Sequence, residues 1–430
     1  MKLELLAPAG DPEKLKIAVL YGADAVYFGG EAFSLRSGAG NFSLEEMREG
    51  IAYAHAHGVK CYLTLNIYPH NEDIAPMEAF LDEIRGIPVD AFLVSDPGAM
   101  MVLKEHIPDA VIHLSTQANM TNYRTAQFWY GQGVRRVVTA REMSLAEISQ
   151  MRGKLPEDME IEAFVHGAMC VSYSGRCLLS NFMTGRDANR GECAHPCRWK
   201  YALVEEKRPG VYWPVEEDAH GSYILNSGDL CMIEHIPELA QAGVTSFKIE
   251  GRMKSIFYLA SVVAQYRKAI DAAECIMEGK AAGDVKGPAA GQDEALAAYR
   301  QEAQTWLAEL GKASHRTFTT GFYFGKPDAS AHNYETSSYV RDYTFIGLVL
   351  GYDEATEEAL VEQRNKMSLG EQIEVFGPQG ESFSQTLGSM KDAESGEPVE
   401  AAPHPQQHLL IRMDQPVSAG SMLRREKLVK

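Results

Sequence analysis

The sequence predicts an α/β protein built on a TIM-type (β/α)8 barrel and followed by a small C-terminal β-domain. Across the first 250 residues, short apolar runs alternate with amphipathic windows, the pattern of a parallel sheet covered by helices. Eight such runs can be counted, which is the number that a closed barrel needs. An open doubly wound sheet is the structural alternative.

Each predicted strand is a short run of mainly apolar residues, and one helix lies between most successive strands. The first helix is expected to begin at Pro12, with Asp11 as its N-cap, because proline suits the first helical position and aspartate accepts the free N–H groups there. The strands are expected at 3–7, 25–28, 59–65, 91–95, 111–115, 135–139, 160–165 and 245–249.

One connection breaks this rhythm. Strands seven and eight are separated by roughly eighty residues, where the other strands need about twenty. The segment that follows a barrel strand lies on the C-terminal face, where active sites are built. We therefore expect a barrel domain over 1–312, with a cysteine-rich insertion at 166–232 on its functional face.

The remaining chain is expected to form two helices, a connection and a second domain. The helical windows cover 253–281 and 290–311, and a polar, aromatic connection covers 313–343. From 344 to 430, β-type runs are separated by glycine, proline and acidic turns, which indicates a small β-barrel or sandwich.

Composition limits the classes of function. The formal net charge of −18 argues against binding nucleic acid through bulk electrostatics. Local basic groups remain, and the alternative is a solvated surface with uneven charge. The N-terminus carries Lys2, Glu4 and Asp11, unlike a signal peptide, and the sequence has no apolar run long enough to cross a bilayer. A cytoplasmic protein is therefore expected. The basic groups are Arg135, Arg136 and Arg141; Arg186, Arg190, Arg198 and Lys200; and Lys248, Arg252 and Lys254.

Five of the seven cysteines fall between Cys170 and Cys231. In a chain that is not secreted, such a cluster favours a metal site or catalysis over disulfides. Thiolates are soft ligands that suit iron-sulfur or zinc, although the spacing is neither that of a zinc ribbon nor that of a ferredoxin. Buried cysteines acting as small apolar residues are the alternative.

The segment from Glu162 to Ser180 resembles the signature of the collagenase-like peptidase family, E-x-F-x-x-G-[SA]-[LIVM]-C-x(4)-G-x-C-x-[LIVM]-S, at every defined position. Other parts of the barrel and its connection also look like landmarks of this family. They are Ala7–Asp11, Ala25–Gly29, Ala140–Ser144, Arg186–Asn189, Lys248–Arg252 and Thr319–Phe322.

The resemblance implies hydroxylation of RNA rather than proteolysis. Relatives in this family act on transfer RNA, ribosomal RNA or a quinone precursor, and four cysteines hold a [4Fe-4S] cluster. Length and the appended β-domain look most like the branch that makes 5-hydroxyuridine at the tRNA wobble position, with prephenate as hydroxyl donor. The implied partner is the tRNA anticodon loop, and the β-domain would help to hold RNA, or act as a lid or oligomer contact. The implied ligands are Cys170, Cys177, Cys193 and Cys231, with Cys197 as a rival for the third place.

Several charged residues near the cysteines are candidates for catalysis or binding. His166 could transfer protons or orient a ligand, and Glu250 could act as an acid-base group or, by preference, as the partner of Arg252. Guanidinium groups bind phosphates and dicarboxylates in a bidentate way. The candidate catalytic residues are His166, Glu250, Arg252 and Arg141, and the candidate substrate- or RNA-binding residues are Arg186, Arg190, Arg198 and Lys254.

Two other classes of function remain open. A cysteine peptidase would pair a thiol with His166 or His195, although no zinc-protease helix or nucleophile elbow is present in the sequence. A non-catalytic RNA-binding protein with structural zinc is the third possibility. Phosphate-loop and dinucleotide-binding fingerprints are absent from the sequence.

Overall fold

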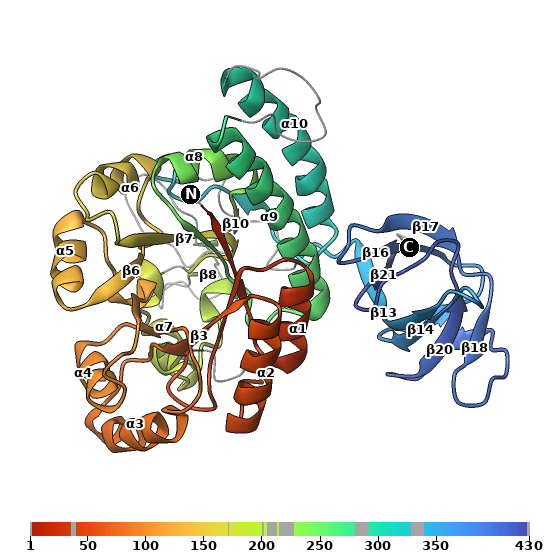
Figure 1. Ribbon diagram of the computed structural model, residues 1–430, viewed down its shortest axis with the longest axis horizontal. Coiled ribbons are helices and arrows are strands. Elements are labelled where there is room, and N and C mark those ends of the chain that lie inside the picture. Colours follow the sequence, from red (N-terminus) through yellow and green to blue (C-terminus); the bar gives the residue numbers. More distant parts are fainter. Residues whose placement is uncertain are drawn as a thin grey trace.

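Eight parallel strands close into a barrel, because β11 pairs with both β7 and β1 (Figure 1). The predicted TIM-type barrel is confirmed, and the open sheet is excluded. The barrel strands are β1 (Glu4–Pro8), β2 (Ala25–Phe28), β3 (Lys60–Leu65), β4 (Ala91–Val94), β5 (Ile112–Leu114), β6 (Val134–Val138), β7 (Glu160–Ala168) and β11 (Ser246–Ile249). The structure is a computed structural model that describes residues 2–35, 40–170, 172–199, 202–203, 213–214, 228–279, 292–327 and 339–427.

Helices cover the outside of the barrel. The first begins at Pro12, and the carboxylate of Asp11 accepts the Lys14 N–H at 2.9 Å, as the sequence predicts. None of the described helices is both long and apolar enough to cross a membrane. The helices are α1 (Pro12–Leu20), α2 (Leu44–Ala56), α3 (Asn71–Ile84), α4 (Pro97–His106), α5 (Tyr123–Gly131), α6 (Leu145–Arg152), α8 (Ile236–Gln241), α9 (Ile256–Met277) and α10 (Gln292–Gly311).

The barrel interior contains a network of charged side chains. Arg136 of β6 pairs with Glu4 of β1 and donates from Nε to Glu160 at 2.7 Å. Lys248 of β11 donates to the fully buried Glu162 of β7 at 2.6 Å. Arg136 and Lys248 are therefore not part of a basic surface, because both occupy inward-facing positions of their strands.

The insertion between β7 and β11 begins and ends at neighbouring positions on the barrel, because its last strand pairs with the end of β7. Strand β10 (Asp229–Cys231) runs antiparallel to the end of β7, with Asp229 opposite Ala168, and β12 (Phe318–Thr319) pairs with β10 on its other side. The other elements of the insertion are short. They are α7 (Leu179–Thr184), β8 (Ala202–Leu203), β9 (Trp213–Pro214) and the 3-10 turns at Tyr173–Gly175, Ala188–Arg190 and Pro196–Arg198.

The C-terminal domain is a seven-stranded antiparallel sheet with its own hydrophobic core, as predicted. Figure 1 shows it beside the barrel, next to α1, α9 and α10. Its strand order is β17-β16-β21-β13-β14-β20-β18. The strands are β13 (Tyr343–Asp353), β14 (Glu358–Gln363), β16 (Gln372–Phe376), β17 (Ser382–Thr386), β18 (Met390–Asp392), β20 (His408–Arg412) and β21 (Met422–Glu426), with a separate pair β15 (Met367–Ser368) and β19 (Ala401–Ala402).

Candidate functional site

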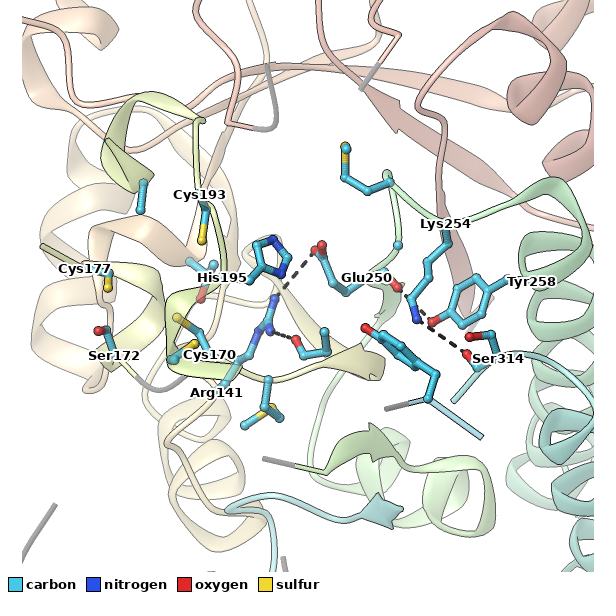
Figure 2. Close-up of a pocket in the computed structure, with 18 of the residues that line it drawn as sticks. Arg141, Cys170, Ser172, Cys177, Cys193, His195, Glu250, Lys254, Tyr258 and Ser314 are labelled. Atoms are coloured by element: carbon cyan, nitrogen blue, oxygen red, sulfur yellow. Dashed lines mark hydrogen bonds and ion pairs between the residues drawn. The ribbon is translucent and has the colours of Figure 1, made fainter. Parts of the chain in front are cut away.

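A pocket of about 550 Å³ opens at the C-terminal ends of the barrel strands. Residues that follow β5, β6, β7 and β11 line it, together with the cysteine-bearing insertion and the connection to the β-domain. Figure 2 shows cysteine side chains at one end of the pocket and Lys254, Tyr258 and Ser314 at the other. Arg141, His195 and Glu250 lie between the two ends.

Four cysteines line this pocket: Cys170, Cys177, Cys193 and Cys197. The sulfur of Cys177 accepts the Leu179 N–H at 3.3 Å, and hydrogen bonds to ligand sulfurs help to set the reduction potential of iron-sulfur clusters. Thiols from separate parts of the insertion thus converge on one cavity.

Two polar residues explain why the insertion folds in this way. Asn189 binds the backbone of Cys177 from both sides, since its Oδ1 accepts the Cys177 N–H at 3.1 Å and its Nδ2 donates to the Cys177 carbonyl at 3.1 Å. Ser180 is fully buried, and its Oγ accepts the N–H of Ala194, the neighbour of Cys193, at 2.9 Å. These residues fix the loops that carry the second and third cysteines.

Cys231, which the resemblance implies as a ligand, is not among the residues that line the pocket. It is buried on β10 opposite His166, and the Tyr266 hydroxyl lies 3.7 Å from its sulfur. Burial raises the pKa of the Cys231 thiol to about 11, although N–H and O–H donors oppose the shift. Cys197, the rival of Cys193 in the ligand set that the resemblance implies, lines the pocket.

Arg141 and Glu250 form an ion pair in the middle of the pocket, with Nη2 and Oε2 separated by 3.8 Å. The guanidinium of Arg141 stacks on Phe164 at 3.8 Å from the ring centroid and donates to the Ala168 carbonyl at 2.7 Å. The expected pair of Glu250 with Arg252 does not form. Arg252 is buried and turned toward the segment after β2, where it donates to Ser34 at 2.6 Å.

Gly167 of the signature allows the ends of β7 and β11 to approach one another. Its φ is +107°, a conformation that side chains rarely adopt, and an added Cβ would lie 2.5 Å from the Glu250 carbonyl oxygen. The Glu250 N–H also donates to the His166 carbonyl at 2.8 Å. A larger residue at 167 would therefore push Glu250 out of the pocket.

The other end of the pocket combines a cation with aromatic rings. Lys254 Nζ lies 4.8 Å from the ring centroid of Tyr258 and 3.9 Å from that of Tyr339. Burial lowers the pKa of Lys254, while Tyr339 and Asp229 oppose this shift. Tyr339 and Arg341 belong to the connection and line the pocket, although neither was a candidate site residue on sequence grounds. The polar, aromatic composition of the connection is the sequence feature that could have indicated these two residues as part of a binding site.

His166 lies outside the pocket. It is buried among the rings of Tyr258, Tyr266 and Phe318, and its Nδ1 is 3.3 Å from the Tyr266 hydroxyl. Burial lowers its pKa to about 3, so it is neutral at physiological pH. This position does not suit direct proton transfer to a ligand in the pocket.

The three arginines expected to bind RNA differ in their surroundings. Arg190 forms a bidentate ion pair with Asp73, in which Nη1 and Nη2 each donate to one carboxylate oxygen at 2.8 Å. Arg186 is exposed, and it is not among the pocket residues. The side chain of Arg198 lies outside the part of the chain that the structure describes.

A second group of metal-binding residue types, His55, Cys61 and Asp90, lies at the opposite end of the barrel. Asp90 accepts the Cys61 N–H at 2.7 Å and contacts His55 at 2.8 Å. The same arrangement recurs at Asp24, which accepts a β1 N–H and pairs with Arg267. In both places an aspartate accepts a backbone N–H near the start of a neighbouring strand. Asp90 therefore has a structural role that explains the group without a metal ion.

Comparisons with known proteins identify the family. The model for peptidase family U32 matches residues 10–333, and the model for the U32 C-terminal domain matches residues 341–424. The chain is 42% identical to tRNA hydroxylation protein P1 of Bacillus subtilis, covering 99% of this chain and 95% of the relative. It is 38% identical to tRNA hydroxylation protein P of Escherichia coli, covering 94% and 92%. It is 32% identical to a collagenase of Porphyromonas gingivalis, covering 87% and 86%. The chain therefore belongs to peptidase family U32.

Proposed function

We propose that this protein hydroxylates the wobble uridine of tRNA to 5-hydroxyuridine, with an iron-sulfur cluster as cofactor and prephenate as hydroxyl donor. The observation that carries the proposal is a pocket lined by four thiols, in which Lys254 lies beside the rings of Tyr258 and Tyr339 at the end away from Cys170, Cys177 and Cys193. The relatives named as tRNA hydroxylation proteins support the choice of RNA, since they match nearly the whole chain.

The pocket cysteines fit a [4Fe-4S] cluster in number and type, because such clusters take four thiolate ligands. We assign Cys170, Cys177, Cys193 and Cys197 to this role, and the N–H donor at the Cys177 sulfur fits it as well. A bound cluster would supply one-electron redox chemistry. The proposal replaces Cys231 by Cys197 as a ligand.

The chain's own residues would bind and orient the two substrates. Lys254 and Arg341 offer cations to the carboxylates of prephenate, while the Tyr258 and Tyr339 rings offer apolar faces to its ring or to a nucleobase. Arg141 stands between this region and the thiols, where Glu250 and Phe164 hold its guanidinium in place. A pocket of about 550 Å³ is in the usual range for small-molecule sites.

A wobble base must leave the anticodon stack to enter such a pocket. Enzymes that act on a base usually extrude it and read it by stacking and hydrogen bonds. We assign the exposed Arg186 to the RNA backbone, whereas Arg190 is held by Asp73 and would contribute to the fold of the insertion. A neutral His166 would pack against Tyr258, which lines the pocket, without contacting the substrate itself.

The test combines cofactor analysis with nucleoside analysis. The protein is purified without oxygen, its iron and sulfide are counted, and its absorption spectrum is recorded. It is then incubated with prephenate, a reductant and tRNA from a strain that lacks 5-hydroxyuridine. We expect about four irons per chain and prephenate-dependent 5-hydroxyuridine. A preparation that holds zinc or no metal after reconstitution, and leaves the tRNA unchanged, would contradict the proposal.

Peptidase activity is the second candidate, because one relative is named a collagenase and His195 lines the pocket with the cysteines. The same preparation is therefore incubated with gelatin and with short collagen-like peptides. Cleavage that is lost in Cys193→Ala and His195→Ala, but is insensitive to iron removal, would favour the peptidase.

A further inference from the structure

A cluster of five polar side chains joins the barrel to the C-terminal domain. Glu309 and Lys312 come from the end of α10 and the residue after it, Tyr343 from β13, Glu374 from β16 and Arg424 from β21. One Glu374 carboxylate oxygen accepts Lys312 Nζ at 2.9 Å and Arg424 Nε at 2.9 Å, while the other accepts the Tyr343 hydroxyl at 3.2 Å. Arg424 also donates to Glu309 at 2.7 Å. The side chain of Arg424 is almost completely buried.

Tyr343 links this cluster to the pocket, because it is one of the pocket-lining residues. Its ring centroid lies 5.5 Å from the Arg424 guanidinium and 5.2 Å from Lys312 Nζ. Phe257 of α9 makes a second link. It lines the pocket and stacks on Phe345 of β13 at 5.6 Å, with an angle of 6° between the rings.

We propose that the C-terminal domain forms one wall of the pocket, and that Arg424 is a positioning residue that holds Tyr343 in that wall. This inference rests on the proposed function, since it names a role for the domain in the same reaction. The buried Arg424 lies against the ring of Tyr343, and the half-buried Glu374 accepts its hydroxyl, so a shift of β21 or β16 changes the shape of the pocket.

The charges of the domain argue against the alternative that it grasps RNA. Residues 344–430 contain 14 acidic and 8 basic side chains, a net charge of −6. Seven of the basic residues lie in the described part, and five of these pair with carboxylates, which leaves few cations for phosphate groups. The five are Arg364, Lys391, Arg412, Arg424 and Arg425.

The test uses the full-length enzyme, with Arg424→Gln compared with Arg412→Gln. Both variants remove one cation from the same domain, but Arg412 is exposed and pairs with the exposed Glu357. We expect Arg424→Gln to lower kcat/KM for tRNA hydroxylation about tenfold or more, with little change in tRNA affinity. Arg412→Gln should leave both quantities within twofold. Weaker tRNA binding by Arg412→Gln would instead support RNA grasping and overturn the proposal.

A double-variant comparison separates positioning from general stabilisation. If Arg424 acts through Tyr343, then Arg424→Gln adds no further loss in a Tyr343→Ala background. Arg424→Lys keeps the charge and should recover part of the activity. Tyr343→Phe keeps the ring beside Arg424 but loses the hydrogen bond to Glu374, so it should retain more activity than Tyr343→Ala. Losses that multiply in the double variant would overturn the proposal.

Hydrogen exchange gives a readout that does not depend on the reaction. Peptides that contain Tyr343 should exchange faster in Arg424→Gln and remain unchanged in Arg412→Gln, with the iron content the same in both. Unchanged exchange at Tyr343 in Arg424→Gln would contradict the positioning role even if the parent enzyme hydroxylates tRNA. If the parent enzyme proves inactive on tRNA, the proposed function fails while this measurement still tests the contact.

Discussion

The ammonium group of Lys248 lies 2.6 Å from Oε1 of Glu162, and both side chains are buried in the barrel interior. Arg136 approaches the other carboxylate oxygen of Glu162 at 3.3 Å and also pairs with Glu4. The interior therefore holds desolvated charges, and each is stabilised by the opposite charge of its ion-pair partner. Removing one partner leaves the others buried without compensation.

We expect Glu162→Gln to lower the free energy of unfolding by roughly 3–5 kcal/mol, because Lys248 and Arg136 lose a buried anion. Urea denaturation measures the change. The control is Glu357→Gln, which removes the carboxylate of an exposed pair with Arg412 and should cost less than about 1 kcal/mol. Equal effects of the two substitutions would contradict this account of the barrel interior.

His166 should make stability depend on pH. The folded protein keeps His166 neutral down to about pH 3, whereas the unfolded chain protonates this histidine near its ordinary pKa of 6.5. The unfolded state thus binds more protons between these values, so the contribution of His166 to stability falls as pH falls through the interval. His166→Phe, which retains an aromatic ring, should show a weaker dependence.

The measurement is the unfolding free energy of both proteins at pH 7 and pH 5. We expect the parent protein to lose stability relative to His166→Phe at the lower pH. Hydroxylation at pH 7 should survive the substitution, because His166 does not line the pocket. A difference that stays constant with pH would argue against a buried neutral histidine.

The ligand assignment predicts opposite results for two cysteines. Cys197→Ser should lower the iron content of anaerobically purified protein, because Cys197 lines the pocket with the other three thiols. Cys231→Ser should retain iron, since this side chain packs against Tyr266. Iron and sulfide counts on the two reconstituted variants show whether Cys197 or Cys231 is the ligand. Loss of iron only in Cys231→Ser would restore the ligand set that the resemblance implied.

Arg252 is expected to act on stability rather than on the cluster. Its guanidinium donates to the Leu35 carbonyl at 2.8 Å and to Asn41 at 2.6 Å, in addition to Ser34. Arg252→Lys cannot reach all of these acceptors, so we expect a loss of about 1–3 kcal/mol with unchanged iron content. Arg85→Lys, at an exposed ion pair, is the control and should change stability by less than about 0.5 kcal/mol. Iron loss in Arg252→Lys would contradict this assignment.

Periodicity and motif spacing were sufficient to predict the eight barrel strands, the N-cap at Asp11 and the place of the insertion. Which charges meet could not be predicted, because Arg136, Glu162 and Lys248 lie far apart in sequence and are joined only by the register of β6, β7 and β11. Glu250 was expected to pair with its near neighbour Arg252. The two side chains instead diverge, and Glu250 meets Arg141.

The pocket wall was the hardest part to foresee. A long polar connection has no periodicity, so nothing in its sequence indicates that Tyr339 and Arg341 return to the barrel face. The prediction of Cys231 as a ligand came from the resemblance alone, and only the pairing of β10 with β7 shows where this thiol lies.

The antiparallel contact between Ala168 and Asp229 brings the two ends of the long insertion side by side. Segments with adjacent ends can change in length or sequence at little cost to the scaffold that carries them. The segment between Ala168 and Asp229 can therefore differ between related proteins while the barrel and its strand register stay the same. A chimaera that carries the insertion of another family member, joined at Ala168 and Asp229, would exchange the cysteine-bearing loops while Lys254, Tyr258 and Arg341 stay in place.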